Sequence, residues 1–151
     1  MMEINGIAHV ILTVRDMKAS APFYRALLTH CGLTNVVDRD DYLYFVGGRT
    51  AIGLRPAAAA HGGERFVQER CGLHHVCLRA RSRADVDALH ALLVTLPGAT
   101  VVHPPREEGW VPGYYSVLFE DPDGIRLELN FVPGKGVFEQ GVERIESPEP
   151  R

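Results

Sequence analysis

Cysteine, tryptophan and positive charge are all scarce in this chain of 151 residues. Its three cysteines, Cys31, Cys71 and Cys77, are odd in number and have no regular spacing, which predicts free thiols rather than a disulfide framework. Lys and Arg number 16 against 19 Asp and Glu, and the net charge of −3 gives no electrostatic basis for binding nucleic acid. These shortages argue against a disulfide-stabilised scaffold and against a nucleic-acid-binding protein.

Long apolar runs are also missing from the sequence. No segment approaches the roughly 18–20 apolar residues that a membrane span needs. The first residues, Met1 to Gly6, lack the charged and apolar regions of a signal peptide. The apolar share of 46% is instead enough for one ordinary core. We therefore expect a cytoplasmic protein that does not bind membranes.

Three segments alternate between apolar and polar residues, as strands with one buried face do. They are residues 7–14, 73–79 and 125–131. Alternation predicts an apolar face formed by Val10, Leu12, Val14, Val76, Leu78, Leu127, Leu129 and Phe131. The opposite face is predicted to carry His9, Thr13, His75, Cys77, Glu128 and Asn130. Two imidazoles and one carboxylate, each expected in the middle of a strand, therefore share one kind of face.

The first two of these segments belong to an internal repeat. The offset 75 − 9 = 66 carries His9 onto His75, Val10 onto Val76, Leu12 onto Leu78 and Leu27 onto Leu93. Each copy is predicted to continue into a helix. Asp16 is the expected cap of the first helix, and Ser82 with Asp85 resembles a capping box at the second, which Pro97-Gly98 should end.

Three further strands are predicted after each helix. Those after the first span about residues 34–38, 42–47 and 50–55, and those after the second about 100–103, 114–120 and 126–131. The last pair is joined by Asp121-Pro122-Asp123-Gly124, where proline presets one dihedral angle and glycine accepts a positive φ. Each half therefore reads β-α-β-β-β, an α+β arrangement, with an alanine- and glycine-rich linker between the halves.

His9, His75 and Glu128 are the residues best suited to chemistry. Two imidazoles and one carboxylate form a donor set for Fe, Mn, Ni, Co or Zn as divalent ions, and such a set leaves coordination positions open. Adjacent oxygens of a small-molecule substrate could fill those positions, with Glu128 as the catalytic residue. The alternative is structural, with the histidines held by hydrogen bonds in their strands and the glutamate on the surface.

A repeated βαβββ module, with a histidine in its first strand and a glutamate after an Asp-Pro-Asp-Gly hairpin, resembles the vicinal oxygen chelate superfamily. The most specific matches are Ile7-Ala8-His9-Val10, His75-Val76-Cys77-Leu78 and residues 119–129. The resemblance implies a cupped mixed sheet formed by two modules, about 4–55 and 73–133, with the linker 56–72 between them. These make one domain over residues 1–133, followed by a C-terminal extension over 134–151. It also implies a homodimer, with modules paired within one chain or exchanged between two.

This superfamily includes glyoxalase I, extradiol dioxygenases, fosfomycin-resistance transferases, methylmalonyl-CoA epimerase and bleomycin-resistance proteins. Gly53 stands where glyoxalase I has a ligand glutamate, and Leu118 stands where extradiol dioxygenases have a tyrosine. We favour isomerase- or lyase-type metal chemistry. The alternatives are a ring-cleaving or other oxygen-dependent dioxygenase, and a bleomycin-resistance-like protein that binds a ligand without catalysis.

The further candidates for substrate binding are Arg55, Trp110, Tyr114, Ser116 and Arg126. Alternation puts Tyr114 and Ser116 on the face of Glu128. The two arginines could hold a substrate carboxylate or phosphate, or be ordinary exposed strand residues. Trp110, in a loop rich in glycine and proline, is either a lid or a packing aromatic. Of the other histidines, His74 should face away from His75, and the sequence offers no partner for His30, His61, His90 or His103.

Overall fold

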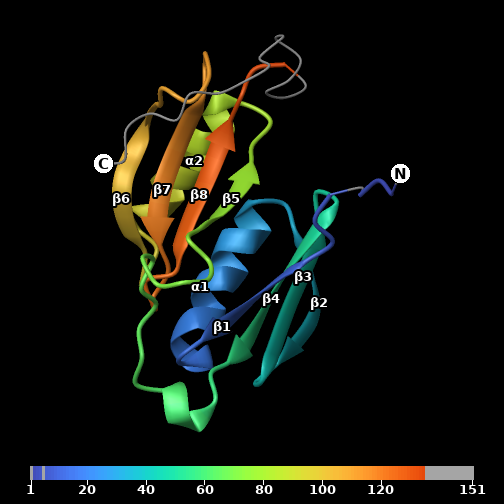
Figure 1. Cartoon of the computed structure of the whole chain (residues 1–151), viewed down its shortest axis with the longest axis vertical. Coiled ribbons are helices and arrows are strands. Elements are labelled where there is room, and N and C mark those ends of the chain that lie inside the picture. The colour runs from blue at the N-terminus through green and yellow to red at the C-terminus, as the bar shows by residue number, and fades with distance from the viewer. Residues whose placement is uncertain (1, 5, 135–151) are drawn as a thin grey trace. The chain divides into compact units, whose positions relative to one another are not determined.

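The chain forms two compact units, seen in a computed structural model that describes residues 2–4 and 6–134 (Figure 1). Unit 1 spans Met1–Phe66 with Leu96–Gly98 and Pro122–Gly124, and unit 2 spans Val67–Thr95, Ala99–Asp121 and the chain from Ile125 onward. Apart from Gly134, the predicted C-terminal extension lies outside the described residues. Each unit is described by itself below.

Unit 1 is a four-stranded mixed sheet with one helix. Its elements are β1 (Val10–Val14), α1 (Met17–His30), β2 (Thr34–Arg39), β3 (Tyr42–Gly47) and β4 (Thr50–Pro56), followed by the 3-10 helix η1 (Ala59–His61). The strand order is β1-β4-β3-β2, with β1 parallel to β4 and the other pairs antiparallel. As predicted, Asp16 caps α1, because its Oδ1 accepts a 2.8 Å hydrogen bond from the backbone N–H of Lys18.

The core of unit 1 lies between α1 and one face of this sheet. The largest fully buried side chains are apolar or aromatic, namely Val14, Phe23, Tyr24, Leu28, Leu43, Phe45 and Leu54. Complete burial of one such leucine or phenylalanine contributes about 1.5–3 kcal/mol. Alternation along β1, β3 and β4 leaves the other face of the sheet free of α1.

Unit 2 repeats this order of elements. It contains β5 (Val76–Arg79), α2 (Arg83–Leu93), β6 (Thr100–Glu107), β7 (Tyr115–Glu120) and β8 (Arg126–Phe131), in the strand order β5-β8-β7-β6. Ser82 caps α2, since its Oγ accepts a 3.2 Å hydrogen bond from the Asp85 N–H. The helix packs on β6, β7 and β8, and Val86, Leu89 and Leu93 bury its apolar side. Two βαβββ modules of an α+β fold confirm the predicted fold class.

The two strands that follow the histidines are shorter than predicted. Strand pairing starts at Val10 with Ile52 in unit 1 and at Val76 with Leu127 in unit 2. His9 and His75 therefore lie immediately before β1 and β5 rather than in the middle of a strand. Both histidines keep the same position within their module, so the repeat predicted from the sequence extends to the structure.

Three other predicted bounds need correction. α2 ends at Leu93, with Val94 as its cap, and so stops before Pro97-Gly98. β6 continues to Glu107, and β7 begins at Tyr115, one residue after Tyr114.

None of the helices in the part of the chain that the structure describes is long and apolar enough to cross a membrane.

The Asp-Pro-Asp-Gly turn forms as predicted between β7 and β8. Gly124 adopts a φ of +84°, which glycine reaches without steric cost. The Asp121 carboxylate accepts a 2.8 Å hydrogen bond from the Ile125 N–H and closes the turn. Within unit 1, Asp123 accepts a 2.6 Å hydrogen bond from the Arg15 N–H, which follows β1 directly.

Candidate functional site

One face of the unit 2 sheet carries a row of chemically distinct side chains. Cys77 on β5 lies opposite Glu128 on β8, Glu128 lies opposite Leu118 on β7, and Leu118 lies opposite His103 on β6. Residues directly opposite one another share a face of the sheet. We call this side of the sheet the Glu128 face; the other side packs against α2.

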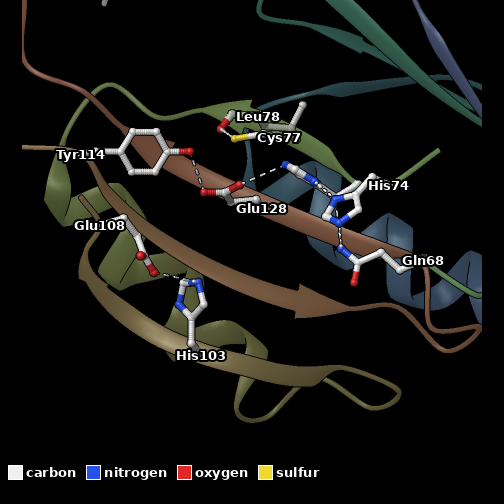
Figure 2. Close-up of polar contacts among 9 residues, drawn as sticks. Gln68, His74, Cys77, Leu78, His103, Glu108, Tyr114 and Glu128 are labelled. Carbon is white, nitrogen blue, oxygen red and sulfur yellow. Dashed lines mark hydrogen bonds and ion pairs between the residues drawn. The ribbon is translucent and has the colours of Figure 1, made fainter. Parts of the chain in front are cut away.

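His75 and Tyr114 both contact Glu128 on this face (Figure 2). His75 Nε2 lies 3.4 Å from Glu128 Oε2, while the Tyr114 hydroxyl donates a 2.7 Å hydrogen bond to Glu128 Oε1. The glutamate side chain is only 10% exposed and the His75 side chain 36%. One carboxylate oxygen is thus held by a tyrosine, and the other remains beside an imidazole nitrogen.

The surroundings of Glu128 keep it ionised. Burial by itself raises the pKa of Glu128, but interactions with His75, Tyr114 and Ser116 outweigh this and lower the pKa below its ordinary value. The Ser116 hydroxyl is buried next to this carboxylate, yet it makes no hydrogen bond of normal geometry to any described residue. An ionised, nearly buried carboxylate is the form that binds a cation.

Burial, with the Glu128 carboxylate as a smaller cause, holds Tyr114 and Cys77 in their neutral forms. Burial, the neighbouring Cys77 and the hydrogen bond to Glu128 all raise the pKa of Tyr114, so its hydroxyl stays a donor. Crowding around the sulfur and the negative charge of Glu128 raise the pKa of Cys77 to about 12. Although the Cys77 side chain reaches solvent, it is therefore a neutral thiol at pH 7.

His74 is the residue that the sequence placed wrongly. Its Nδ1 lies 2.7 Å from Nδ1 of His75, and the two rings meet edge to face at 5.0 Å. Strict alternation does not hold here because both histidines precede the first paired residue of β5. The Gln68 amide nitrogen lies 2.8 Å from His74 Nε2, so Gln68, His74, His75 and Glu128 form a continuous chain of polar contacts (Figure 2).

His103 is a second residue that sequence analysis missed. Its Nδ1 donates a 3.0 Å hydrogen bond to the carbonyl of Pro104, and its Nε2 lies 3.6 Å from Glu108 Oε1 (Figure 2). Arg106 donates a 2.6 Å hydrogen bond to the same glutamate oxygen. The side chains of His103 and Glu108 are only 11% and 13% exposed.

A β-bulge explains why alternation could not find His103. Val101 lies opposite Phe119, whereas His103 lies opposite Leu118, so the register shifts between them. An extra residue in a strand reverses which face the following side chains occupy. Without the bulge, His103 would share the face of Val101, turned away from Glu128.

In unit 1, the predicted ligand His9 is exposed and lies directly before β1.

The strand register tests the prediction that Gly53 stands at a metal-ligand position of the family. Ile11 pairs with Gly53 just as Cys77 pairs with Glu128, and 11 + 66 = 77, so Gly53 occupies the position of Glu128 in the repeat. A Cβ atom on Gly53 would lie 2.6 Å from Ile11 Cδ1 and 2.8 Å from Tyr44 Cδ2. Those two side chains occupy the space that a carboxylate would need.

The other predicted substrate-binding residues differ in their exposure and in whether their side chains already have a partner. Arg126 is engaged by Glu120, with Nη2 2.6 Å and Nε 3.2 Å from one carboxylate oxygen, so its charge is already compensated. Trp110 is 42% exposed in the connection between β6 and β7. Arg55 lies in unit 1, exposed on β4.

The donor atoms on the Glu128 face fit a divalent ion in chemistry and spacing. Two ligand atoms bound to one ion at about 2.0–2.2 Å, with an angle of about 90–110°, lie about 2.8–3.6 Å apart. The His75 Nε2 to Glu128 Oε2 distance of 3.4 Å falls in this range. Among the described residues no group of three or more His, Cys, Asp or Glu is gathered around one point, so unit 2 by itself supplies two donors.

Comparison with known proteins finds the same architecture repeatedly. A family model described as Glyoxalase/Bleomycin resistance protein/Dioxygenase superfamily matches residues 6–129. A candidate glyoxalase from Bacillus halodurans superposes with a TM-score of 0.73 at 25% identity, over 85% of this chain and 96% of that one. Lactoylglutathione lyase from Agrobacterium tumefaciens gives a TM-score of 0.62 at 27% identity, over 85% and 95%.

The chain also has a relative of similar sequence that it matches over most of its length. The uncharacterized protein YqjT of Bacillus subtilis is 28% identical over 122 residues, which cover 80% of this chain and 94% of the relative. The family match extends from before β1 to the middle of β8 and so includes both modules. The chain therefore belongs to the glyoxalase/bleomycin resistance protein/dioxygenase superfamily.

Proposed function

We propose that this protein is a metal-dependent enzyme in which His9, His75 and Glu128 hold one divalent ion of Fe, Mn, Ni, Co or Zn. The observation that carries the proposal is the pairing of His75 Nε2 with an ionised Glu128 carboxylate at 3.4 Å. His9 is the natural third ligand, because it has the same position before β1 that His75 has before β5. These three residues leave coordination positions for a small-molecule substrate.

A bound divalent ion would act as a Lewis acid toward two adjacent oxygens of that substrate. The protein's own groups prepare the site for it. Tyr114 fixes one oxygen of Glu128 by a hydrogen bond, which orients the other oxygen toward His75. His74 holds His75 at Nδ1 and leaves Nε2 free to bind. Glu128 is accordingly both a metal ligand and the proposed catalytic carboxylate.

The substrate face offers both proton donors and acceptors. Tyr114 remains protonated and donates its one O–H to Glu128, so its oxygen can still accept a hydrogen bond, and the Ser116 hydroxyl, which makes no hydrogen bond of normal geometry, can donate to a substrate oxygen. Isomerase- or lyase-type proton transfer is the reaction class that we favour, since it needs acid and base groups and no second substrate. The similarity to a structure named lactoylglutathione lyase supports this preference.

An oxygen-dependent dioxygenase is the second candidate. Tyr114 contacts Glu128, and His103 lies on the same face of the sheet two strands away, although neither is at the position expected from the sequences of ring-cleaving enzymes. A small panel of α-hydroxycarbonyl, catechol and thiol substrates separates the two reaction classes, because only the dioxygenase consumes oxygen.

The first prediction concerns metal binding. Protein purified without chelator should contain about one divalent ion per chain by elemental analysis. His9→Ala, His75→Ala and Glu128→Ala should each weaken metal binding strongly. The loss should exceed the factor of about 10–100 that is expected when a residue only orients a ligand. Calorimetric titration of the chelator-treated protein measures this directly.

His30→Ala is the matched control, because His30 is an exposed histidine at the end of α1. Its metal affinity should equal that of the unmodified protein. If the protein binds no ion even at millimolar metal, the proposal is wrong, and ligand binding without catalysis, as in bleomycin-resistance proteins, becomes the better reading of the fold.

We also propose that residues 1–133 act as one domain built from the two modules, and that the protein is a homodimer. Pairing of modules brings a histidine of the first module to the Glu128 face of the second. That pairing takes place within one chain or by exchange between two chains.

A further inference from the structure

Unit 1 has a cavity of its own on the face of its sheet that α1 does not cover. The cavity has a volume of about 410 Å³ and is lined by Ile11, Arg39, Asp41, Tyr42 and Arg55. Ligand-binding cavities in proteins are typically about 300–1,000 Å³. We call it the arginine–tyrosine pocket. None of its residues is a proposed metal ligand.

The strand register explains how these side chains meet. Arg55 on β4 lies opposite Thr13 on β1, and Tyr42 on β3 lies opposite Arg39 on β2. Leu43 pairs with Leu54, so the next residues, Tyr42 and Arg55, are also neighbours across β3 and β4. The two arginines therefore approach the same tyrosine from the strands on either side.

Tyr42 lines the pocket with a flat aromatic ring. The rings of Tyr42 and Tyr44 stack with centroids 5.8 Å apart and an angle of 19° between their planes. The guanidinium carbon of Arg39 lies 5.7 Å from the centre of the Tyr42 ring. A planar group that enters the pocket can stack on the tyrosine while its edge faces a guanidinium group.

The pocket carries more positive than negative charge. Arg39 is paired with Asp41 at 3.1 Å, both side chains being more than half exposed. Within the described part of the chain, Arg55 takes part in no hydrogen bond or ion pair. Two arginines against one aspartate leave a charge of about +1, which suits a singly charged anion better than a doubly charged one.

We propose that the arginine–tyrosine pocket binds the carboxylate of a planar, aromatic or conjugated small molecule. Arg55 binds the carboxylate through its guanidinium N–H groups, and Tyr42 stacks against the planar part. The proposal goes beyond the metal-dependent function and does not rest on it, because none of the five residues that line the pocket is a proposed metal ligand.

A matched set of four probes tests the chemistry of the ligand. Benzoate is planar and singly charged, cyclohexanecarboxylate has the charge without the plane, benzamide has the plane without the charge, and phenyl phosphate carries more charge. Binding is followed by NMR shifts of Tyr42 and Arg55 in full-length protein treated with chelator, so that metal plays no part. Benzoate should bind in the millimolar range, and benzamide and cyclohexanecarboxylate should each bind at least about fivefold more weakly.

Variants of the pocket assign the roles of its residues. Arg55→Gln should weaken benzoate binding by about fivefold to tenfold. Tyr42→Leu should remove the preference for benzoate over cyclohexanecarboxylate, and Tyr42→Phe, which keeps the ring, should retain it. Asp41→Asn should strengthen benzoate binding by about two- to fivefold, because it removes the negative charge beside Arg39.

Arg49→Gln is the control, since Arg49 lies in the turn between β3 and β4 and does not line the pocket. It should leave benzoate affinity unchanged.

Three results would overturn the proposal. They are no change in the NMR shifts at about 20 mM benzoate, binding of benzamide as tight as that of benzoate, or an unchanged benzoate affinity in Arg55→Gln. Tighter binding of phenyl phosphate than of benzoate would overturn the assignment to a carboxylate. Loss of metal binding in the His75 variant, by contrast, tests only the metal-dependent function.

Discussion

Among single residues, the orientation of the His75 ring matters most for the Glu128 face. A histidine binds a metal ion through a ring nitrogen that carries no proton, and the partner of the other nitrogen decides which nitrogen that is. His75 meets Glu128 at Nε2 and His74 at Nδ1. The Gln68 amide N–H donates to His74 Nε2, so neutral His74 carries its proton on Nδ1 and donates it to His75 Nδ1, and metal-free His75 presents its Nε2–H to Glu128. A bound ion would replace this Nε2 proton, and His75 Nδ1 would then donate to His74.

The second prediction follows from this contact. His74→Phe keeps an aromatic ring but removes the acceptor for His75 Nδ1, so metal affinity should fall by about 10–100-fold with His75 and Glu128 intact. ¹⁵N NMR should show His75 protonated mainly at Nε2 in metal-free protein and at Nδ1 after addition of zinc, and the Nδ1 shift of His75 should differ in His74→Phe because its partner is gone. His74→Asn, whose amide oxygen accepts a hydrogen bond, should restore part of the affinity.

A change of the same kind at His30 serves as the comparison. His30→Phe should alter neither the metal affinity nor the nitrogen shifts of His75, because His30 lies in unit 1 at the end of α1. If His74→Phe leaves both measurements unchanged, His74 does not orient His75.

Single elements differ between the two copies of the repeated module. β4 and β8 occupy the same place in their sheets, but β8 carries Glu128 where β4 carries Gly53. In unit 1 the side chains of Ile11 and Tyr44 close over the glycine. At this position β8 thus carries a carboxylate, whereas β4 carries a glycine covered by the side chains of Ile11 and Tyr44.

The third prediction tests this packing above Gly53. Gly53→Ala places a Cβ within 2.8 Å of both neighbouring side chains, so the unfolding free energy should fall by about 1–3 kcal/mol. For the same reason, Gly53→Glu should destabilise the protein rather than add a fourth metal ligand. Urea denaturation measures the first effect, and metal titration of the glutamate variant measures the second.

Gly63→Ala is the control for this prediction. A Cβ on Gly63 meets nothing within 4 Å, and its backbone is not in the left-handed region. Its stability should change by less than about 1 kcal/mol. Equal effects at the two glycines would mean that Ile11 and Tyr44 move aside without cost.

In the molecule as a whole, two copies of one topology present two different surfaces. The Glu128 face of unit 2 carries a nearly buried carboxylate with histidine and tyrosine neighbours, while the corresponding part of unit 1 carries tyrosines and arginines. Each sheet also ends in edge strands, β1 and β2 in unit 1 and β5 and β6 in unit 2. Edge strands present unpaired backbone groups that favour pairing with another strand, and twofold dimers are the commonest soluble oligomers.

The fourth prediction is that the protein is a dimer with two metal ions. Sedimentation at micromolar concentration should give twice the chain mass of 16.7 kDa. A monomer under these conditions contradicts the proposed assembly.

Mixing His9→Ala with Glu128→Ala subunits then shows whether each metal site is formed within one chain or between two chains. If modules are exchanged between chains, statistical mixing restores about one quarter of the original sites. No recovery means that each site is built within one chain.

The sequence by itself determined the secondary structure and the module. Alternation and capping residues gave the order β-α-β-β-β twice, because strand and helix periodicities and the Asp16 and Ser82 caps act over only a few residues. The resemblance to glyoxalase I also placed Gly53 at a ligand position, and the strand register then matched Gly53 to Glu128. Alternation placed His75 and Glu128 on the same kind of face, and the family resemblance implied that they meet.

Only the tertiary structure decided where alternation fails. The bulge in β6 turns His103 toward the Glu128 face, and the late start of β5 lets His74 meet His75. Glu120 occupies Arg126, whereas Arg55 is left for the arginine–tyrosine pocket. Each of these outcomes depends on which residue of a distant strand lies opposite, and that register is set by pairing across the sheet rather than by neighbours in the sequence.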